Sequence, residues 1–441
     1  MHDAGGWRLP AAPMTLVEKV IARAAGRARV RPGEIMTAKV DFAFAHDSSG
    51  PRRWQPYLEQ LGTGVWDPAK VAIVTDHYVP ATDLESAEIL STTRAFVAAH
   101  GIRNFFDMVG ICHLVLPEHG LIRPGAFIAG GDSHTPMAGA FGAYAAGYGA
   151  TDMAAIIASG ETWLAVPHTL RVVWSGAFAR GVVAKDVMLF LCRTLGLDNA
   201  FTAIEYCGPT IAAMTMPERM VLCNMAAELG CDTGVIAPDR VTFDYLRSRG
   251  APVADESAAA ALASDPQAAC RAEHRFDAGA LAPQIALPHS PANSVAADEL
   301  DRIRIDQAYI GACVGAKLSD LRMAAEVLHG RKVAPHVRLL VAPASAQTTQ
   351  AAIAEGVLAS LVDAGAILLP SGCGACAGLG AGMLAAGETC ISSTNRNFRG
   401  RMGSAQATVY LGSPYSVAAA AVAGRIVDPR ELLDGVSGEP A

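Results

Sequence analysis

Residues 307–315 read Gln-Ala-Tyr-Ile-Gly-Ala-Cys-Val-Gly, and this stretch holds the pattern that predicts the fold. A short apolar run, Gln307–Ile310, stops at a glycine, and Cys313 follows soon after it. Runs of this kind, bounded by glycine or polar residues, are typical of buried parallel strands. The same pattern occurs at Val71–Val74, Ala126–Ala129, Ala366–Leu369 and Cys390–Ser393.

Helical patterns alternate with these apolar runs along the chain. They cover Leu318–Leu328, Ala346–Ala364 and Ser416–Gly424. Strands that alternate with helices predict an α/β architecture. In open α/β sheets, ligands bind beyond the carboxyl ends of the strands. The polar loops that follow the apolar runs are therefore expected to converge on one site.

The composition is that of a globular chain. Of its 441 residues, 51% are hydrophobic and 17% are charged, so the chain can bury a large core and form about two to four domains. The formal net charge is −7, which argues against nucleic acid or an anionic membrane surface as the main partner. An acidic substrate would therefore need a local group of basic residues.

The N-terminus shows no basic segment followed by an apolar one, so we expect no secretory signal peptide. The longest apolar stretch, Gly139–Gly160, contains Asp152 and several glycines, and it predicts a buried helix rather than a membrane span. Ten cysteines in a chain of this length are too few for a disulfide scaffold. We therefore expect a cytoplasmic protein with reduced thiols.

Three of the ten cysteines stand out. Cys373 and Cys376 form a C-x-x-C in a glycine-rich segment, which alone is compatible with a redox pair, a zinc site or part of an iron–sulfur site. Cys313, after its own strand, favours the iron–sulfur interpretation, because three thiolates leave one iron of a [4Fe–4S] cluster free to act as a Lewis acid. The other seven lie in apolar surroundings and are expected to fill the core: Cys112, Cys192, Cys207, Cys223, Cys231, Cys270 and Cys390.

Two histidine–carboxylate motifs, Asp76-His77 and Asp132-Ser133-His134, each follow a predicted strand. A carboxylate beside a histidine fixes the tautomer of the ring and raises its basicity, as in a general acid–base unit. Each motif taken alone is also compatible with a polar turn at the surface.

The stretch from Asn395 to Arg401 reads Asn-Arg-Asn-Phe-Arg-Gly-Arg. Arginine side chains match carboxylates in bidentate geometry, so this stretch predicts a clamp for an acidic substrate, with a solvated basic turn as the alternative. His113 and Glu205 lie in apolar stretches. They are either buried, hydrogen-bonded groups or part of the site.

Residues 249–298 are rich in alanine and proline and predict a connection between domains. We predict an α/β domain at residues 1–170 with the two histidine–carboxylate motifs. A second α/β domain at 171–294 includes the connection, and a third at 295–441 carries the cysteines and the arginines.

Together these motifs resemble the aconitase family and, within it, the large catalytic subunits of 3-isopropylmalate dehydratases and homoaconitases. The resemblance extends from Thr15 to about Pro429. The matching motifs are Thr75-Asp76-His77, Gly110-Ile111-Cys112-His113, Leu116-Pro117-Glu118-His119-Gly120, Gly131-Asp132-Ser133-His134-Thr135, the three cysteines, and Asn395 through Arg401.

The resemblance implies three α/β/α domains around a [4Fe–4S] cluster bound by Cys313, Cys373 and Cys376. It implies that Asp76 and His77 protonate the departing hydroxyl group. The other residues that it places at the site are Asp132, His134, His113 and Glu205 near the reacting groups, and Ser133, Asn395, Arg396 and Arg401 near the substrate.

The activity implied is that of a hydro-lyase, which isomerises a 2-hydroxy di- or tricarboxylic acid by dehydration and rehydration. The first expectation is 3-isopropylmalate and 2-isopropylmalate, as in leucine biosynthesis; a homoaconitase or a methylmalate- or dimethylmalate-type dehydratase is the alternative. A competing class is an iron–sulfur or thiol protein for electron transfer or redox sensing, which would need neither the histidine–carboxylate motifs nor the arginines.

Two departures from the family pattern bear on these expectations. The family commonly has Cys-Thr-Asn-Gly-Arg where residues 313–317 here read Cys-Val-Gly-Ala-Lys, which removes polar groups beside the implied cluster. The fourth, swivelling domain of single-chain aconitases, which brings a catalytic serine base, has no counterpart in this sequence. The resemblance therefore implies a separate small subunit that carries this domain.

Overall fold

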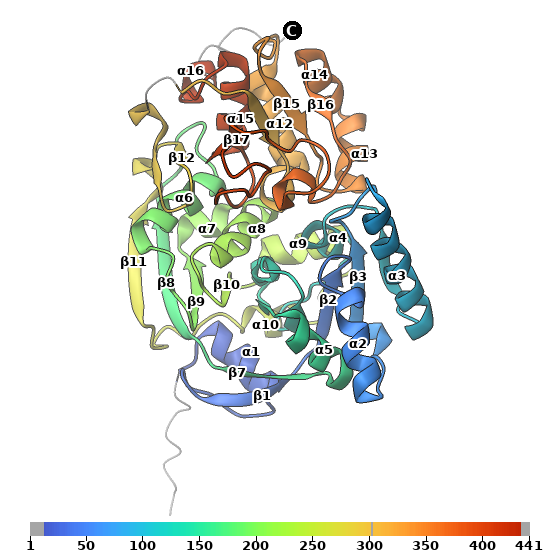
Figure 1. Ribbon diagram of the computed structural model, residues 1–441. Helices are drawn as coiled ribbons and strands as arrows, with labels where there is room; N and C mark the ends of the chain where they lie inside the picture. The colour runs from blue at the N-terminus through green and yellow to red at the C-terminus, as the bar shows by residue number, and fades with distance from the viewer. Residues whose placement is uncertain (1–12, 301–302, 434–441) are drawn as a thin grey trace, which may run out of the picture.

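The computed structural model describes residues 13–300 and 303–433, in which three largely parallel sheets and one two-stranded ribbon are surrounded by helices (Figure 1). The α/β class predicted from the sequence is confirmed. Within the described residues, no helix has both the length and the apolar character needed to cross a membrane.

The first sheet has the strand order β4-β3-β2-β5-β6, and all its neighbouring strands run parallel. Its strands are β2 (Phe42–His46), β3 (Val71–Thr75), β4 (Asn104–Asp107), β5 (Phe127–Gly130) and β6 (Tyr144–Gly147). The helices of this part of the chain are α1 (Leu16–Ala24), α2 (Pro51–Leu61), α3 (Leu84–His100), α4 (Cys112–Glu118) and α5 (Ala150–Ser159), with the 3₁₀ turns η1 (Pro68–Lys70) and η2 (Thr135–Phe141).

The second sheet has the parallel order β10-β9-β8-β11. Its strands are β8 (His168–Ser175), β9 (Thr202–Cys207), β10 (Thr233–Val235) and β11 (Ala272–Asp277). The accompanying helices are α6 (Ala184–Leu195), α7 (Pro209–Ala213), α8 (Met216–Asn224), α9 (Arg240–Ser248) and α10 (Glu256–Ala260), with η3 (Met225–Ala227) and η4 (Ala278–Ala280).

The third sheet has the order β13-β12-β18-β17-β14-β15-β16; β12 pairs antiparallel with both of its neighbours, and the other pairs are parallel. Its strands are β12 (Gln284–Ala286), β13 (Ser294–Ala296), β14 (Gln307–Ile310), β15 (Arg338–Val341), β16 (Ile367–Leu368), β17 (Thr389–Ser392) and β18 (Thr408–Leu411). Its helices are α11 (Ala312–Gly315), α12 (Leu318–Leu328), α13 (Ala346–Ala354), α14 (Val357–Ala364), α15 (Pro414–Ala423) and α16 (Arg430–Leu433), with η5 (Ala297–Glu299) and η6 (Gly374–Ala377).

The ribbon pairs β1 (Ile35–Lys39) with β7 (Glu161–Ala165) in antiparallel register. Local sequence explains where several helices begin and end. The side chain of Asp83 accepts a hydrogen bond from Ser86 N and so caps the start of α3, which ends at Gly101 in the left-handed conformation.

Four local predictions need correction. The run Ala366–Leu369 supplies the edge strand β16, but both residues of this strand are exposed rather than buried. The stretch Gly139–Gly160 is not one helix, because glycines divide it into the end of η2, strand β6 and helix α5. The helix predicted over Ala346–Ala364 is two helices, because Gly356 has a positive φ of 73° between them. Residues 249–298 are more than a connection, since they supply β11 to the second sheet and β12 and β13 to the third.

One buried apolar cluster joins all three parallel sheets. It includes Phe44 of the first sheet, Trp174 of the second and Tyr309 of the third. In Figure 1 the strands β15, β16 and β17 of the third sheet, in orange and red, lie above the blue strands β2 and β3 of the first and the green strands β8 and β9 of the second. This packing brings loops from distant parts of the chain to one place. The domain boundaries at residues 170 and 294 stay a prediction.

Candidate active site

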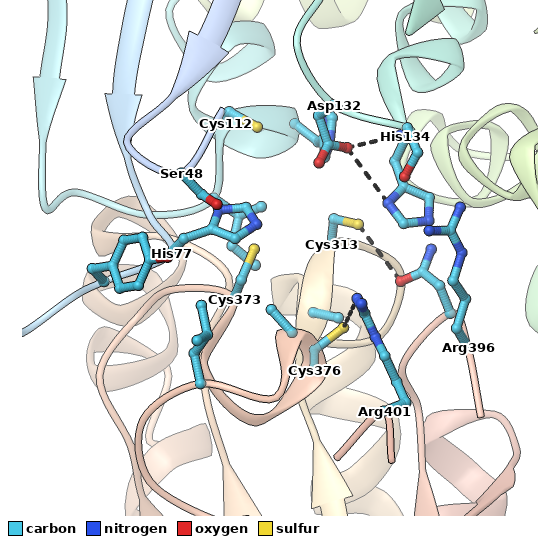
Figure 2. Close-up of a pocket in the computed structure, with 18 of the residues that line it drawn as sticks. Ser48, His77, Cys112, Asp132, His134, Cys313, Cys373, Cys376, Arg396 and Arg401 are labelled. Carbon is cyan, nitrogen blue, oxygen red and sulfur yellow. Dashed lines mark hydrogen bonds and ion pairs between the residues drawn. The ribbon is translucent and has the colours of Figure 1, made fainter. Parts of the chain in front are cut away.

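A cavity of about 430 Å³ opens where loops after the first and third sheets meet. Figure 2 shows the sulfur atoms of Cys313, Cys373 and Cys376 between His77 on one side and Arg396 on the other. The structure brings most of the sequence-predicted site residues to the wall of this cavity: His77, His113, Asp132, Ser133, His134, Cys313, Cys373, Cys376, Asn395, Arg396 and Arg401. Asp76 lies directly behind His77, wholly buried.

The three predicted thiols come from two loops of the third sheet. Cys313 lies in α11, directly after β14, and Cys373 and Cys376 lie at η6. None of them forms a disulfide. Burial raises the pKa of Cys313 to about 12, so a thiolate at this position requires a cation beside it.

The spacing of the thiols fits a metal cluster better than a single ion. In the described part of the chain, two groups of three or more residues have all their potential metal-ligand atoms within 4.8 Å of one another. Both groups consist of histidine and aspartate and contain no cysteine. The three sulfur atoms are thus not all within 4.8 Å of one another, whereas thiolates on one tetrahedral zinc ion, with Zn–S bonds of about 2.3 Å, would be closer together.

Polar groups still surround the thiols, although residues 314 and 315 depart from the usual Thr-Asn. Asn224 Nδ2 donates a hydrogen bond of 3.2 Å to Cys313 Sγ, and Asn224 Oδ1 accepts one of 2.7 Å from Asn395 Nδ2. Arg401 Nη2 lies 4.0 Å from Cys376 Sγ. Val314 is buried, and a Cβ atom on Gly315 would lie 2.2 Å from Ser393 Oγ. Val314 and Gly315, which differ from the usual Thr-Asn, therefore contribute to packing.

The Asp76–His77 pair is held rigidly. His77 Nδ1 lies 2.6 Å from Asp76 Oδ1, and Asp76 Oδ2 accepts a hydrogen bond of 2.7 Å from Cys112 N. The carboxylate of Asp47 accepts from three successive backbone N–H groups, at residues 76–78. Burial alone would lower the pKa of His77, but Asp76 and the neighbouring carboxylates outweigh it and raise this pKa to about 9. The His77 ring is therefore protonated at neutral pH.

Asp132 is the centre of a second network. Its Oδ1 lies 2.7 Å from His113 Nε2 and accepts a hydrogen bond of 2.7 Å from His134 N. Its Oδ2 lies 3.3 Å from Nε2 of His46, whose ring stacks on His77 at 3.8 Å between centroids. Burial would raise the pKa of Asp132, but the surrounding histidines hold it well below its usual range. The second network thus touches the first through His46.

Glu205 does not lie at the cavity. Its side chain points from β9 toward Arg171, whose Nε lies 3.3 Å from Glu205 Oε2. The buried carboxylate at the site is Glu228, just after η3, and its side chain is 1% exposed. Glu228 Oε1 lies 2.9 Å from His134 Nε2 and accepts a hydrogen bond of 2.7 Å from Arg396 Nε. Both glutamates stand in apolar sequence, so no local signal distinguishes them.

Other site residues were also missed by sequence reasoning. Ser48, Arg52 and Arg53, after β2, line the cavity. Lys185 is buried behind it and donates a hydrogen bond of 2.6 Å to the carbonyl oxygen of Thr394, and burial lowers its pKa to about 8. The sequence Pro-Arg-Arg at residues 51–53 offered a signal for basic residues, but it follows no motif that marks a site.

The cavity as a whole combines a histidine and several arginines with cysteines that form no disulfide. Its lining carries four arginines, Arg52, Arg53, Arg396 and Arg401, which suits a substrate with more than one carboxylate. Such an arrangement can bind a small polycarboxylate, deliver a proton from a histidine, and hold a metal group on thiolates.

Comparison with known proteins agrees with this geometry. The model of the aconitase family (aconitate hydratase) matches residues 18–301 and 296–424. A 3-isopropylmalate dehydratase large subunit of Methanopyrus kandleri is 45% identical over 426 residues, which cover 95% of this chain and 99% of the relative. The corresponding large subunit of Aquifex aeolicus is 41% identical, with 95% and 98% covered. A probable methanogen homoaconitase large subunit of Methanothermobacter thermautotrophicus is also 41% identical, with 95% and 98% covered.

The contacts of Glu228 predict that Glu228→Gln destabilises the protein. The substitution removes the charge that offsets Arg396 and His134, and hydrogen bonds to charged groups contribute roughly 1.5–3 kcal/mol each. Urea denaturation of the two proteins measures the difference. Glu205→Gln is the matched control, because its contact with Arg171 is longer and we expect a smaller loss. Equal stability of Glu228→Gln and the unmodified chain would contradict the importance of this ion-pair network.

Proposed function

Because this chain belongs to the aconitase family, we propose that it is the large subunit of a hydro-lyase that interconverts 3-isopropylmalate and 2-isopropylmalate, as in leucine biosynthesis. The observation that carries the proposal is the cavity in which three cysteines without a disulfide lie together with His77, whose Nδ1 is 2.6 Å from the buried carboxylate of Asp76. The identity and near-complete coverage of the isopropylmalate dehydratase large subunits support the choice of substrate.

The residues fit a [4Fe–4S] cluster as the cofactor. Cys313, Cys373 and Cys376 supply three thiolates from separate points of one cavity wall, and a cluster normally takes four. When bound, the cluster supplies one iron without a protein thiolate, which acts as a Lewis acid on the substrate hydroxyl and one carboxylate.

His77 is the proposed proton donor. Loss of the hydroxyl group from the substrate requires a proton on the departing oxygen, so that water leaves. The Nδ1 of His77 is engaged by Asp76 at 2.6 Å, which leaves Nε2 to face the cavity and to give its proton. In the reverse, hydration step the same ring nitrogen takes a proton from the attacking water, whose oxygen adds to the neighbouring carbon.

Arg396 and Arg401 are the proposed carboxylate ligands. Elimination removes a weakly acidic proton from the carbon next to a carboxylate, and negative charge develops on that carboxylate as the C–H bond breaks. Arginine side chains on the cavity wall stabilise this charge. Glu228 holds Arg396 through Nε, so the terminal nitrogens of this arginine are available to the substrate.

The base that removes this carbon-bound proton is proposed to come from a separate small subunit. The relatives are named as large subunits, and the cavity is partly open to solvent. A partner seated over this opening would bring the base to the substrate and exclude water from the reaction.

The first test concerns the cofactor. We expect the chain, reconstituted with iron and sulfide under anaerobic conditions, to bind four irons and four sulfides and to show the broad visible absorbance of a [4Fe–4S] cluster. Cys313→Ser, Cys373→Ser and Cys376→Ser should each lose most of this absorbance. Cys207→Ser, in β9 and not part of the cavity lining, is the control and should keep it. Full iron and sulfide content in all three site variants would exclude these cysteines as ligands.

The second test concerns the reaction and the partner. The cluster-loaded chain alone should be inactive. Mixing it with its cognate small subunit should produce dehydration of 3-isopropylmalate, which is measured through the absorbance of the unsaturated product. Homocitrate and methylmalate, assayed in parallel, measure substrate preference. Full turnover by the large subunit alone would refute the need for the partner, and inactivity of the complex on every hydroxy acid would refute the function.

The third test concerns His77. In the complex, His77→Gln should lower kcat by about 10²–10⁴-fold, the range for loss of a general acid, while iron content stays unchanged. His100→Gln, at the end of α3 and outside the cavity, should leave kcat near that of the unmodified enzyme. Near-normal turnover of a cluster-loaded His77→Gln complex would mean that His77 is structural.

A further inference from the structure

Tyr309 carries a buried hydroxyl group that the mechanism above does not use. The residue lies in β14, four positions before Cys313, and its side chain is wholly buried. Its hydroxyl oxygen has no hydrogen-bond partner among the described residues. Buried polar side-chain atoms in proteins are almost always paired, so an unpaired hydroxyl points to a group that binds there.

The hydroxyl group lies between the two loops that carry the thiols. A Cβ atom on Gly311, two residues before Cys313, would lie 2.7 Å from the hydroxyl oxygen and 2.2 Å from Cε1 of the ring. A Cβ atom on Gly374, which directly follows Cys373, would lie 3.7 Å from the same oxygen. The absence of a side chain at Gly311 therefore leaves room for the Tyr309 ring. The hydroxyl group of this ring lies near the backbone of the C-x-x-C turn.

A tyrosine hydroxyl group is protonated at neutral pH and can donate a hydrogen bond. Thiolates and inorganic sulfides are the acceptors that a cluster would place nearby.

Water is the competing partner for the hydroxyl group. The Tyr309 ring borders a second cavity of about 310 Å³, next to the first, whose wall includes Leu369 and Met383. The hydroxyl oxygen itself is buried from solvent, so water in that cavity does not reach it in this conformation. This difference makes the two partners separable by experiment.

We propose that Tyr309 is a positioning residue whose hydroxyl group donates a hydrogen bond to a sulfur atom of the cluster held by Cys313, Cys373 and Cys376. This inference rests on the proposed function, because it requires the cluster. A hydrogen bond to a cluster sulfur offsets negative charge and favours the more reduced form, so it raises the reduction potential. It also makes the cluster harder to oxidise, and an oxidised cluster readily loses the iron that has no protein thiolate.

Tyr309→Phe tests the proposal, because it keeps the packing of the ring and removes only the hydroxyl group. Redox titration of the cluster-loaded protein, followed by EPR, should show a more negative midpoint potential than in the unmodified protein. Exposure to air should bleach the visible absorbance faster. Tyr206→Phe is the matched control: Tyr206 is equally buried, but its hydroxyl donates to Met188 Sδ at 3.4 Å, so both properties should stay unchanged.

Thermal unfolding supplies a readout that does not depend on activity or potential. In the cluster-free protein, Tyr309→Phe removes an unpaired buried hydroxyl, and we expect a higher melting temperature. In the cluster-loaded protein the same substitution removes a hydrogen bond, and we expect a lower one. This reversal of sign is specific to a partner that arrives with the cluster.

An unchanged midpoint potential, or the same change of melting temperature in both forms, would overturn the proposal and assign the hydroxyl to water or to no partner. Failure of the unmodified chain to take up any cluster would instead refute the proposed cofactor. The two failures are thus distinguishable in one set of preparations.

Discussion

A backbone hydrogen bond of 2.7 Å from Cys373 N to Asp76 O joins the C-x-x-C loop of the third sheet to the acid pair of the first. A second junction lies beside it, where Gly110 pairs with Ser345 and a Cβ atom on Gly110 would lie 2.5 Å from Ser345 Cα. The position of His77 relative to the thiols is therefore set by main-chain contacts between two sheets. Because backbone groups are less mobile than long side chains, these contacts would hold the proposed proton donor in a fixed position relative to the thiols.

The electrostatics of the cavity follow from the burial of its charged groups. The chain has a net charge of −7, yet the cavity wall presents arginines and a protonated histidine, so the field that a polycarboxylate meets is local. Three carboxylates at or behind the wall are paired: Asp76 with His77, Asp132 with His113, and Glu228 with His134 and Arg396. A buried charge without such a partner would be strongly destabilising. The networks thus stabilise the fold as well as orient the side chains that would meet the substrate.

The strands that end at the site were predictable from the sequence, whereas its internal pairing was not. The run Gln307–Ile310 is strand β14, as predicted. A short apolar run that ends at a glycine is typical of a buried strand in an α/β chain. The motifs after such runs therefore fell at the carboxyl ends of strands, where the cavity lies. Glu205 and Glu228 could not be told apart, since which of two glutamates in apolar sequence meets His134 depends on tertiary packing. The missing hydrogen-bond partner of the Tyr309 hydroxyl group could not be predicted for the same reason, because it depends on how the folded chain packs around the ring.

The central claim is that three thiolates hold a [4Fe–4S] cluster with one iron open to the substrate. Mössbauer spectroscopy of the ⁵⁷Fe-loaded chain together with its small subunit, recorded with and without 3-isopropylmalate, tests this claim most directly. The account predicts that the substrate changes the isomer shift and quadrupole splitting of one iron in four and leaves the other three unchanged. Four irons that do not respond to the substrate would contradict the Lewis-acid role, and a preparation that binds zinc in place of iron would contradict the cluster itself.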